Sequence, residues 1–575
     1  MHVLGLSFFY HDSAAAILRD GELIAAAAEE RFSRVKHDHG FPALAVEFCL
    51  RKAGIAASDL DYVVFYEKPF VKFERILLCA LQTFPRSWKV FRESMLTWLT
   101  DKLWVKDLIR ERLRVERGRI LFADHHMSHA ASAFYCSPFE EAAVLTVDGA
   151  GEWTTATMGV GRGTEIRIDR EMRFPHSVGL LYSAFTAFCG FEVNEGEYKL
   201  MGMAPYGKPK HVDKVKEVVK IAEDGSIWHD MSFFSYHWSP ASTLSKKFLD
   251  LFGPVRELSQ VDKTLDPYYA DVAASIQVVT EEILIRMART LRRDTGLKRL
   301  CMAGGCALNS VANAKILRES GFEELFVHPA AGDDGGAVGA AMWAYHGLLG
   351  KPRRFVLEHA YWGEEYGEGE IADFLRREGI PHVRLGDDEK VLDRTVEALV
   401  AGRVVGWYDG RFEWGPRALG SRSILADPRR AEMKDVVNAK IKFREAFRPF
   451  APSVIVEKAR EYFELDDPAR HYPARFMLYV VPVVEGKRET IPAITHVDGT
   501  GRLQTVHAPT SPRYHRLISR FGEATGVPVL LNTSFNLKGE PIVTTPENAY
   551  RTFMRSGMDL LVLKNHLVTK DGGKS

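Results

Sequence analysis

The stretch "ADHHMSHAASAF", residues 123–134, carries three histidines among alanines and serines in a helix-forming context. In a helix, His125 and His129 are four residues apart and share one face, whereas His126 points elsewhere. Two imidazoles on one face form half of a metal site. For an isolated pair at this spacing, hydrogen-bonded histidines beneath a loop are the commoner arrangement. A metal site therefore requires further donors from other parts of the chain.

Two aspartates can supply these donors. Asp148 follows an apolar run in "LTVDGAG", and Asp334 precedes an expected helix in "GDDGGA". Two imidazoles and two carboxylates suit Fe(II), Mn(II) or Zn(II), with weak selectivity because no cysteine takes part. Either aspartate alone is more often a turn former or a helix cap. The four residues together favour the metal site.

Glycine-rich turns around these aspartates expose backbone N–H groups that suit phosphate or ribose. The two segments are "MAGGCALNS" (302–310) and "GDDGGAVG" (332–339), and neither matches the P-loop or the dinucleotide fingerprint. We expect nucleotide contacts from Gly149, Gly304, Gly305, Asn309, Asp333 and Gly335.

A candidate base follows the first expected strand. His11 and Asp12 stand in "FFYHDSAA", where a carboxylate can orient the imidazole and raise its basicity, as a base acting on an alcohol requires. A capped turn with a structural histidine is the alternative. Lys199, in "VNEGEYKLMGMAPYG", is a further catalytic candidate if that glycine-containing segment forms a cleft loop; an ordinary surface loop is equally compatible with it.

Positive side chains in the last third of the chain alternate with Phe and Pro, as in "FREAFRPFAP", rather than forming Glu/Lys pairs. Guanidinium groups combined with hydroxyl and amide donors suit a phosphate or a compact anion. A solvated charged face is the commoner fate of such runs. We favour a lined pocket here, formed by Arg417, Lys442, Arg448, Arg502, Ser534 and Asn536.

The bulk composition describes a soluble globular protein of two large domains, because 575 residues exceed one ordinary core and 46% are hydrophobic and 26% charged. Lys plus Arg equals Asp plus Glu at 76 each, so the whole-chain charge indicates neither a nucleic acid nor a membrane partner. Six scattered cysteines without a CxxC pair fit a reducing cytoplasm. The N-terminus lacks the pattern of a secretion signal, and no apolar run is long enough to span a bilayer.

The order of patterns along the chain indicates an internal repeat. The start reads as strand, turn, strand, with a hairpin turn at Asp20-Gly21, and a similar three-strand pattern returns near residue 140. Two such halves predict an actin-like α/β domain. Residues 71–116 are helical in pattern and aromatic; we favour an inserted helical pair over a membrane-surface helix or a substrate lid. A long helix is expected over 268–296, a linker over 356–394 and a second domain from 395.

Taken together, these segments closely resemble the O-carbamoyltransferases of the nodulation and antibiotic-tailoring family. The resemblance covers nearly the whole chain, and the matching motifs are "HDSAAAILRDGELIAAAAEERFSRVKH", "HHMSHAASAF", "VDGAGEW", "GEYKLMGMAPYG", "GGCALN", "RFEWGPRALGSRSILADPR", "FREAFRPFAPSV" and "LLNTSFNLKGEPI". It implies a Kae1-like, actin-like domain with duplicated ribonuclease H-like halves over 1–355. It also implies a YrdC-like α/β domain over 395–575.

The resemblance further implies the chemistry. The YrdC-like domain would combine carbamoyl phosphate with Mg-ATP to give carbamoyladenylate and pyrophosphate. The first domain would then pass the carbamoyl group to a hydroxyl and release AMP. By motif match, Fe(II), or else Mn or Zn, would be held by His125, His129, Asp148 and Asp334, with the adjacent Asp333 leaving the register of the last ligand open. His11 would be the base, and the basic pocket would hold carbamoyl phosphate and the adenylate.

Three alternatives stay open from the sequence. They are threonylcarbamoyl transfer to tRNA adenosine, a sugar-kinase-like phosphotransferase, and a non-catalytic nucleotide-binding switch. The neutral charge balance disfavours a tRNA partner. We expect a small-molecule hydroxyl acceptor, and a homodimer is compatible with the chain. A sugar, a macrolide, a β-lactam hydroxymethyl group or a polysaccharide would each fit as the acceptor.

Overall fold

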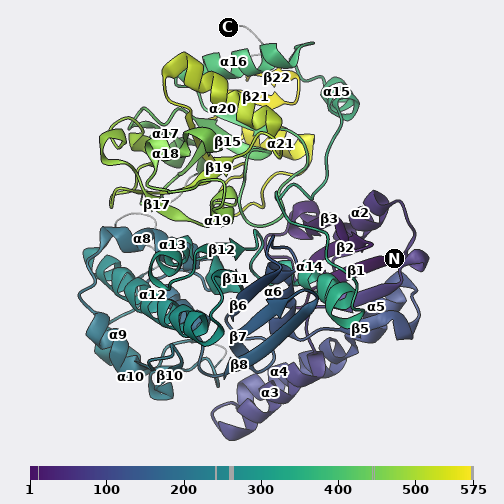
Figure 1. Cartoon of the computed structure of the whole chain (residues 1–575), viewed down its shortest axis with the longest axis vertical. Helices are drawn as coiled ribbons and strands as arrows, with labels where there is room; N and C mark the ends of the chain where they lie inside the picture. Colours follow the sequence, from purple (N-terminus) through teal and green to yellow (C-terminus); the bar gives the residue numbers. More distant parts are fainter. Residues whose placement is uncertain (11, 240–241, 258–264, 443–444, 446, 571–575) are drawn as a thin grey trace. The chain divides into compact units, whose positions relative to one another are not determined.

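The computed structural model describes the chain except residues 11, 240–241, 258–264, 443–444, 446 and 571–575 (Figure 1). It divides into two compact units. Unit 1 comprises Met1–Glu29 and His39–Leu357, and unit 2 comprises Glu30–Asp38 and Glu358–Ser575.

The short segment Glu30–Asp38 corrects the predicted first domain, 1–355, because it belongs to unit 2. Its two arginines hydrogen-bond to distant backbone carbonyls of that unit. Arg31 donates to the carbonyls of Glu413 and Gly415 at 3.3 and 3.0 Å. Arg34 donates to the carbonyl of Ile542 at 2.6 Å.

The first sheet of unit 1 has the strand order β3-β2-β1-β4-β5. Strands β1 to β3 are antiparallel neighbours, whereas β4 and β5 continue parallel to β1. The predicted hairpin turn is confirmed, since Asp20 and Gly21 join β2 to β3 with positive φ of 51° and 86°. The strands are β1 His2–Ser7, β2 Ala14–Arg19, β3 Glu22–Ala28, β4 Tyr62–Phe65 and β5 Ile120–Phe122.

The second sheet of unit 1 repeats this topology. Its order is β12-β11-β6-β7-β8, so three antiparallel strands are again followed by two strands parallel to the first of them. The predicted internal duplication and the actin-like α/β class are thereby confirmed. The strands are β6 Glu141–Val147, β7 Thr154–Arg162, β8 Glu165–Arg173, β11 Arg299–Ala303 and β12 Glu324–Val327.

Helices α6 and α14 contact each other and connect the two sheets of unit 1 (Figure 1). Gly339 on α14 allows this close approach, because a Cβ there would lie 1.8 Å from the carbonyl oxygen of Ser128 on α6. Gly5 likewise allows β1 to approach α14, because a Cβ at Gly5 would lie 1.8 Å from the carbonyl oxygen of Ala337. Small residues at these points therefore set the spacing of the centre of unit 1.

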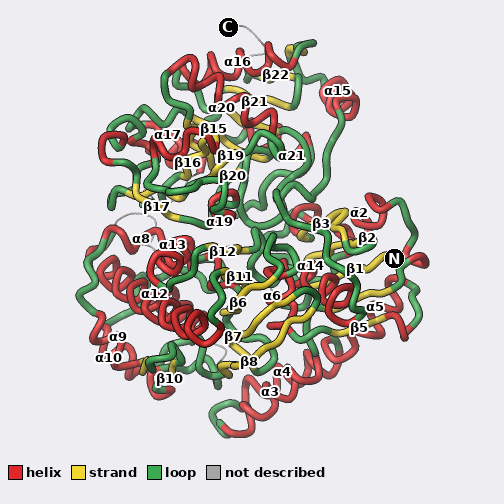
Figure 2. The backbone as a smooth tube through the Cα atoms, viewed as in Figure 1, coloured by secondary structure: helices red, strands yellow, loops and turns green. Residues whose placement is uncertain are grey.

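Helix α2 packs on the first sheet, whereas α7, α8, α9 and α13 contact the long α12, which Figure 2 shows beside the second sheet. That helix, predicted at 268–296, is confirmed at Pro267–Thr295. The helices are α2 Ala43–Ala53, α6 His125–Phe134, α7 Val178–Phe188, α8 Glu197–Met203, α9 Val212–Val218, α10 Lys246–Phe252, α13 Ser310–Glu319 and α14 Gly335–Met342. A small ribbon is formed by β9 Val219–Ile221 and β10 Ile227–His229.

The segment predicted as helical over 71–116 forms α3 Pro69–Gln82, α4 Trp88–Thr100 and α5 Val105–Leu113. Helix α3 buries Lys72, Arg75 and Ala80 within unit 1. Its other side and the following loop expose large apolar residues, among them Phe70, Leu81 and Phe84.

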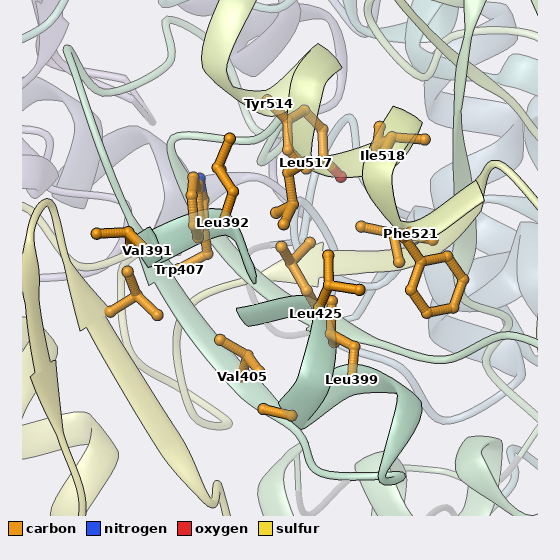
Figure 3. Packing of buried hydrophobic residues seen from close by; sticks show 14 of the residues in the cluster. Val391, Leu392, Leu399, Val405, Trp407, Leu425, Tyr514, Leu517, Ile518 and Phe521 are labelled. Atoms are coloured by element: carbon orange, nitrogen blue, oxygen red, sulfur yellow. The ribbon is translucent and has the colours of Figure 1, made fainter. Parts of the chain in front are cut away.

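Unit 2 is built on an eight-stranded mixed sheet of order β13-β22-β21-β14-β15-β20-β16-β19. Its core packs α16 and α20 against the central strands, with Trp407 and Leu517 among the fully buried residues (Figure 3). The strands are β13 Val383–Arg384, β14 Val405–Tyr408, β15 Arg422–Ala426, β16 Ala451–Ile455, β19 Gln504–Val506, β20 Val529–Ser534, β21 Leu560–Leu563 and β22 His566–Val568. A ribbon pairs β17 Val480–Pro482 with β18 Thr500–Arg502.

The linker predicted over 356–394 is wrong, because this stretch folds as part of unit 2 from Glu358 onward. It contains α15 Glu368–Arg377, strand β13 and the start of α16 Asp388–Val400. Its Pro, Arg, Gly and Glu content resembles a linker, yet Val391 and Leu392 are fully buried in the core of unit 2. The other helices are α1 Glu30–Ser33, α17 Met433–Val437, α18 Ala459–Tyr462, α19 Tyr472–Arg475, α20 Pro512–Thr525 and α21 Pro546–Met554.

We predict that Gly339→Ala lowers the free energy of unfolding by about 2 kcal/mol, because the added methyl group meets backbone rather than a movable side chain. Gly118→Ala is the matched control: a Cβ at Gly118 meets nothing within 4 Å, so a change within about 0.5 kcal/mol is expected. Urea unfolding followed by circular dichroism measures both. Equal stability of the two variants would contradict the close approach of α6 and α14.

Candidate metal centre and active site

Four buried side chains of unit 1 converge on one point. His125, His129, Asp148 and Asp333 each offer a ligand atom, and these atoms all lie within 4.8 Å of one another. The Nε2 atoms of the two histidines are 3.1 Å apart. Oδ2 of Asp148 is 3.2 Å from Nε2 of His125, and Oδ1 of Asp333 is 3.4 Å from Nε2 of His129. The prediction that these histidines and Asp148 come together is confirmed.

Three of the four residues lie where a secondary-structure element begins or ends, and the fourth, His129, lies within α6. His125 is the first residue of α6, and His129 follows it on the same face, one turn later. Asp148 comes directly after β6. Asp333 lies in the loop immediately before α14, whose N-cap is Asp334. The centre of the duplicated fold thus brings together residues more than 200 positions apart in the chain.

The donor set fits a divalent transition metal. Atoms bound to one such ion at about 2.1 Å are about 3.0–3.4 Å from each other, which is the spacing of the closest pairs here. Oδ2 of Asp333 and Nδ1 of His129 are buried without a hydrogen-bond partner among the described residues. Two imidazoles and two carboxylates form a mixed N/O site of the kind that Fe(II), Mn(II) and Zn(II) accept.

The charges of this cluster are strongly coupled. Burial by itself lowers the pKa of His125, but Asp333, Asp148 and Glu67 outweigh it and raise that pKa well above its usual value. Burial raises the pKa of Asp148, but its hydrogen bond to His125 and the other nearby imidazoles hold it well below the usual value. The cluster therefore favours a bound positive charge, whether a proton or a metal ion.

Asp333 replaces Asp334 as the fourth donor, which corrects the sequence-based choice. Oδ1 of Asp334 accepts a hydrogen bond from the backbone N–H of Gly335 at 3.0 Å and caps α14. Asp333 is 2% exposed and faces both histidines. The assignment depends on which aspartate begins the helix, and two adjacent aspartates before two glycines leave this open in the sequence.

Glu67 faces the Nδ1 side of the His125 ring, and the sequence analysis did not identify it. Its Oε2 lies 3.6 Å from Nδ1 of His125 and 2.6 Å from Nζ of Lys72. Burial raises the pKa of Glu67, but Lys72 and His125 outweigh it and bring this pKa to about 2. At 3.6 Å the contact between Glu67 and His125 is electrostatic, and Nδ1 of His125 has no hydrogen-bond partner among the described residues. A carboxylate that hydrogen-bonds to the second nitrogen of a metal-binding imidazole fixes its orientation and tautomer, and Glu67 lies where a small shift would make that bond. The available signal was a glutamate shortly after the apolar strand β4, in "YVVFYEKP".

Glu152 organises the start of α6 and was also missed, although it stands in the "VDGAGEW" motif. Its Oε1 accepts hydrogen bonds from the backbone N–H groups of His125 at 3.0 Å and Lys68 at 2.8 Å. A carboxylate at a helix N-terminus is favourable for the helix dipole and satisfies an otherwise unpaired donor. Glu152 therefore fixes the backbone from which the first imidazole projects.

His126 points away from the cluster, as predicted. Its Nδ1 lies 2.7 Å from Oγ1 of Thr146, and its Nε2 lies 3.0 Å from the carbonyl oxygen of Thr154. Burial lowers the pKa of His126 well below its usual value, so the ring is neutral. It joins α6 to β6 and β7 and has a structural role.

Most of the predicted nucleotide-binding residues have structural contacts in unit 1. The backbone N–H of Gly305 donates to Oδ1 of Asp148 at 2.7 Å. Gly304 has a positive φ of 94°, and a Cβ there would lie 2.3 Å from the carbonyl oxygen of Val147. Asn309 is the N-cap of α13. Gly335 packs on the carbonyl of Ala330, whereas a Cβ at Gly149 would meet nothing within 4 Å. Their contacts to a nucleotide stay a prediction.

The predicted catalytic residues lie outside the cluster or outside the described residues. His11 belongs to the latter group. Asp12 follows β1 with a positive φ of 64°, and its carbonyl accepts a hydrogen bond from Ser7 Oγ at 3.4 Å. Lys199 is on α8, with its Nζ 6.0 Å from the ring centroid of Phe191. Their catalytic roles stay predictions.

Three members of the predicted basic pocket of unit 2 do come together. Nζ of Lys442 lies 3.1 Å from Oγ of Ser534, 2.8 Å from Oδ1 of Asn536, and also contacts the Ser534 carbonyl. Arg448 is 3.6 Å from a carboxylate oxygen of Glu445. Arg502 ends β18, and Arg417 is half-buried in the loop before β15.

Comparison with known proteins covers both units. Residues 2–342 match the family described as "Carbamoyltransferase N-terminus", and residues 396–570 match "Carbamoyltransferase C-terminus". The chain belongs to the carbamoyltransferase family. It is therefore an enzyme that transfers carbamoyl groups.

Several relatives of this carbamoyltransferase span most of the chain. An uncharacterized protein of Synechocystis is 46% identical, covering 99% of this chain and 97% of its own. Nodulation protein NolNO of Sinorhizobium fredii is 38% identical, and the match covers 98% of this chain and 79% of NolNO. The 3'-hydroxymethylcephem-O-carbamoyltransferase of Amycolatopsis lactamdurans is 31% identical, and the match covers 73% of this chain and 75% of that enzyme.

Likeness to solved structures concerns the fold alone. Component A of (R)-2-hydroxyglutaryl-CoA dehydratase from Acidaminococcus fermentans covers 61% of this chain and 99% of its own, at 15% identity and a TM-score of 0.31. The match to HypF of T. kodakarensis covers 61% of this chain and 48% of the HypF chain, at 13% identity and a TM-score of 0.31. In the described part of the carbamoyltransferase chain, every helix is too short or too polar to cross a bilayer.

We predict that Asp333→Asn reduces the bound transition metal at least about tenfold, because an amide is a poorer ligand than a carboxylate. Asp334→Ala is the comparison: it should keep the metal but lower the free energy of unfolding by about 1 kcal/mol, because it removes a helix cap. Metal content after Fe(II) loading is measured by plasma mass spectrometry. Loss of metal from Asp334→Ala alone would reverse the assignment.

Proposed function

We propose that this carbamoyltransferase is an ATP-dependent O-carbamoyltransferase that works in two steps. In unit 2, water cleaves carbamoyl phosphate to carbamate and inorganic phosphate. An oxygen of the carbamate then attacks the α-phosphorus of ATP, which gives carbamoyladenylate and releases pyrophosphate. In unit 1, the carbamoyl group passes to a hydroxyl of a small molecule or a sugar, and AMP is released. The observation that carries the proposal is the buried set of two histidines and two aspartates in unit 1 of a carbamoyltransferase.

The proposal includes a divalent metal ion in unit 1. His125, His129, Asp148 and Asp333 would hold it. Fe(II) is our first choice, with Mn(II) or Zn(II) as alternatives. When bound, a divalent ion there supplies Lewis-acid stabilisation of phosphate oxygens, which makes AMP a better leaving group.

The protein's own residues prepare this site before any reactant enters. Glu67 faces Nδ1 of His125 at 3.6 Å and is proposed to orient this imidazole, and Lys72 keeps Glu67 ionised. Gly305 holds one oxygen of Asp148 through its backbone N–H, which leaves the other oxygen facing the histidines. Burial of all four donors keeps water away from a labile mixed anhydride.

In unit 2, Lys442 is the residue that we assign to binding carbamoyl phosphate and the adenylate. It is only 4% exposed, and its ammonium group contacts the oxygen atoms of Ser534 and Asn536, which carry no charge. A buried ammonium group binds phosphate and carboxylate oxygens through strong charge-assisted hydrogen bonds. Arg417, Arg448 and Arg502 complete the proposed pocket.

The acceptor is proposed to be an alcohol, since two relatives are named 3'-hydroxymethylcephem-O-carbamoyltransferase. His11 is proposed to take the proton from the attacking hydroxyl, with Asp12 and Lys199 assisting. Transfer then breaks the bond between the carbamoyl carbon and the phosphate oxygen of AMP and forms the O-carbamoyl ester.

We predict that the Fe(II)-loaded enzyme, given ATP, carbamoyl phosphate and a panel of alcohols, produces AMP, pyrophosphate, inorganic phosphate and an alcohol heavier by one carbamoyl group. Mass spectrometry of the products measures this. Two variants separate the steps. Lys442→Met should abolish ATP–pyrophosphate exchange that depends on carbamoyl phosphate, whereas His11→Ala should keep this exchange and lose transfer by about 100-fold or more.

Three outcomes would contradict the proposal. ADP as the product would indicate a kinase. Exchange without carbamoyl phosphate would remove carbamoyladenylate from the reaction. Unaltered transfer by His11→Ala would exclude His11 as the base.

A further inference from the structure

Arg75, on α3, is a buried cation without a polar partner. It is 9% exposed, and among the described residues it makes no hydrogen bond or ion pair; its one defined contact is with the ring of Phe174, 4.8 Å from the guanidinium carbon to the ring centroid. A contact through the face of a guanidinium does not use its N–H donors, which lie in its plane. Five donors therefore remain for another group.

The other buried cations of the described chain all have polar or sulfur partners. Lys72 pairs with Glu67, Lys442 contacts Ser534 and Asn536, and Arg31 and Arg422 donate to backbone carbonyls. Arg256 lies 3.8 Å from the sulfur of Met203. Since burying a charge without a partner is costly, an exception such as Arg75 points to a group that binds there.

The location of Arg75 connects it with the metal cluster. It lies three residues after Lys72 on the same face of α3. Lys72 bonds to Glu67, and Glu67 faces His125. The ring of Tyr10 covers Lys72 at 4.5 Å and is itself 38% exposed, so this wall of the site reaches solvent. A small molecule held by Arg75 would lie near the metal cluster.

The two carboxylates near Arg75 already have other partners. Glu67 is neutralised by Lys72, and Glu152 accepts hydrogen bonds from two backbone N–H groups at the start of α6. Burial lowers the pKa of Arg75, although Tyr10, Cys79 and the two glutamates raise it in part, and a guanidinium remains charged after such a shift. The guanidinium is thus available to an incoming anion.

We propose that Arg75 binds an acidic group of the acceptor, so that the acceptor is a hydroxylated acid bearing a carboxylate or a phosphate. The planar fork of a guanidinium matches both groups through two parallel hydrogen bonds. This inference rests on the proposed function, since it names the class of alcohol that receives the carbamoyl group. It also gives the helical segment α3–α5 a part in acceptor recognition.

The test uses the full chain loaded with Fe(II) and four probes. Glucose, glucuronate and glucose 6-phosphate differ only at carbon 6, which is neutral, a carboxylate or a phosphate ester, and AMP carries the phosphate of the donor. Isothermal calorimetry compares wild type, Arg75→Met and the control Arg86→Met, which changes an exposed arginine in the loop between α3 and α4. We expect one or both acidic sugars to bind wild type and Arg86→Met roughly 10- to 100-fold more tightly than glucose, and Arg75→Met to lose this preference.

Three results would overturn the assignment. Equal binding of acidic and neutral sugars by wild type, or a preference retained by Arg75→Met, would exclude an acidic acceptor group at Arg75. Weaker binding of AMP alone to Arg75→Met would assign the guanidinium to the donor phosphate instead. Failure of the proposed function is distinguishable, because it appears as missing ATP–pyrophosphate exchange in wild type, which the binding data do not involve.

Thermal stability separates ligand binding from a structural role. Removing an unpaired buried charge should leave the melting temperature of Arg75→Met equal to or above that of wild type. A lower melting temperature would indicate that Arg75 serves the fold. If Arg75→Met does not fold, Arg75→Lys replaces it, since it keeps the charge but loses the fork; undiminished preference for the acidic sugars in that variant would then overturn the bidentate assignment.

Discussion

The structure of unit 1 depends on holding two imidazole nitrogens 3.1 Å apart beside two carboxylates inside the protein. Such a cluster is stable only with a compensating positive charge, because buried carboxylates and closely spaced imidazoles are each unfavourable alone. The surrounding fold serves this constraint: α6 begins at the first histidine, β6 ends before Asp148, and glycines at 5 and 339 allow α14 to approach. The duplicated topology supplies these element ends at one place.

A second layer of charges links this cluster to the helical segment beside it. His125 faces Glu67, Glu67 pairs with Lys72, and Lys72 is followed by Arg75 on the same helix. Glu67 thus lies between two positive partners, whereas Arg75 makes no hydrogen bond or ion pair among the described residues and is the group that we propose to bind the acceptor. The segment that looks like an insertion in the sequence thus contributes to both the support of the metal centre and the proposed recognition of the acceptor. Helices on the edge of a shared fold are a usual place for such specificity.

Local patterns predicted much of this protein, and tertiary contacts explain the rest. The spacing of His125 and His129 follows from helix periodicity, and the two β-meanders follow from strand patterns and turns. The choice between Asp333 and Asp334 depends on the first residue of a helix, which the sequence leaves open by one position. Arg31 belongs to unit 2 through hydrogen bonds to residues more than 380 positions away, and no local signal reports such a contact. Glu67 and Glu152 stand in recognisable local contexts, but their contacts with His125 form only in the folded chain.

The central claim is that these four side chains bind one catalytic metal ion, and anomalous X-ray diffraction from crystals of the Fe(II)-loaded enzyme tests it most directly. The account predicts one anomalous peak at the iron edge, about 2.0–2.3 Å from Nε2 of His125, Nε2 of His129 and carboxylate oxygens of Asp148 and Asp333. A peak elsewhere in the chain, or none at this position in crystals of an active preparation, would contradict it.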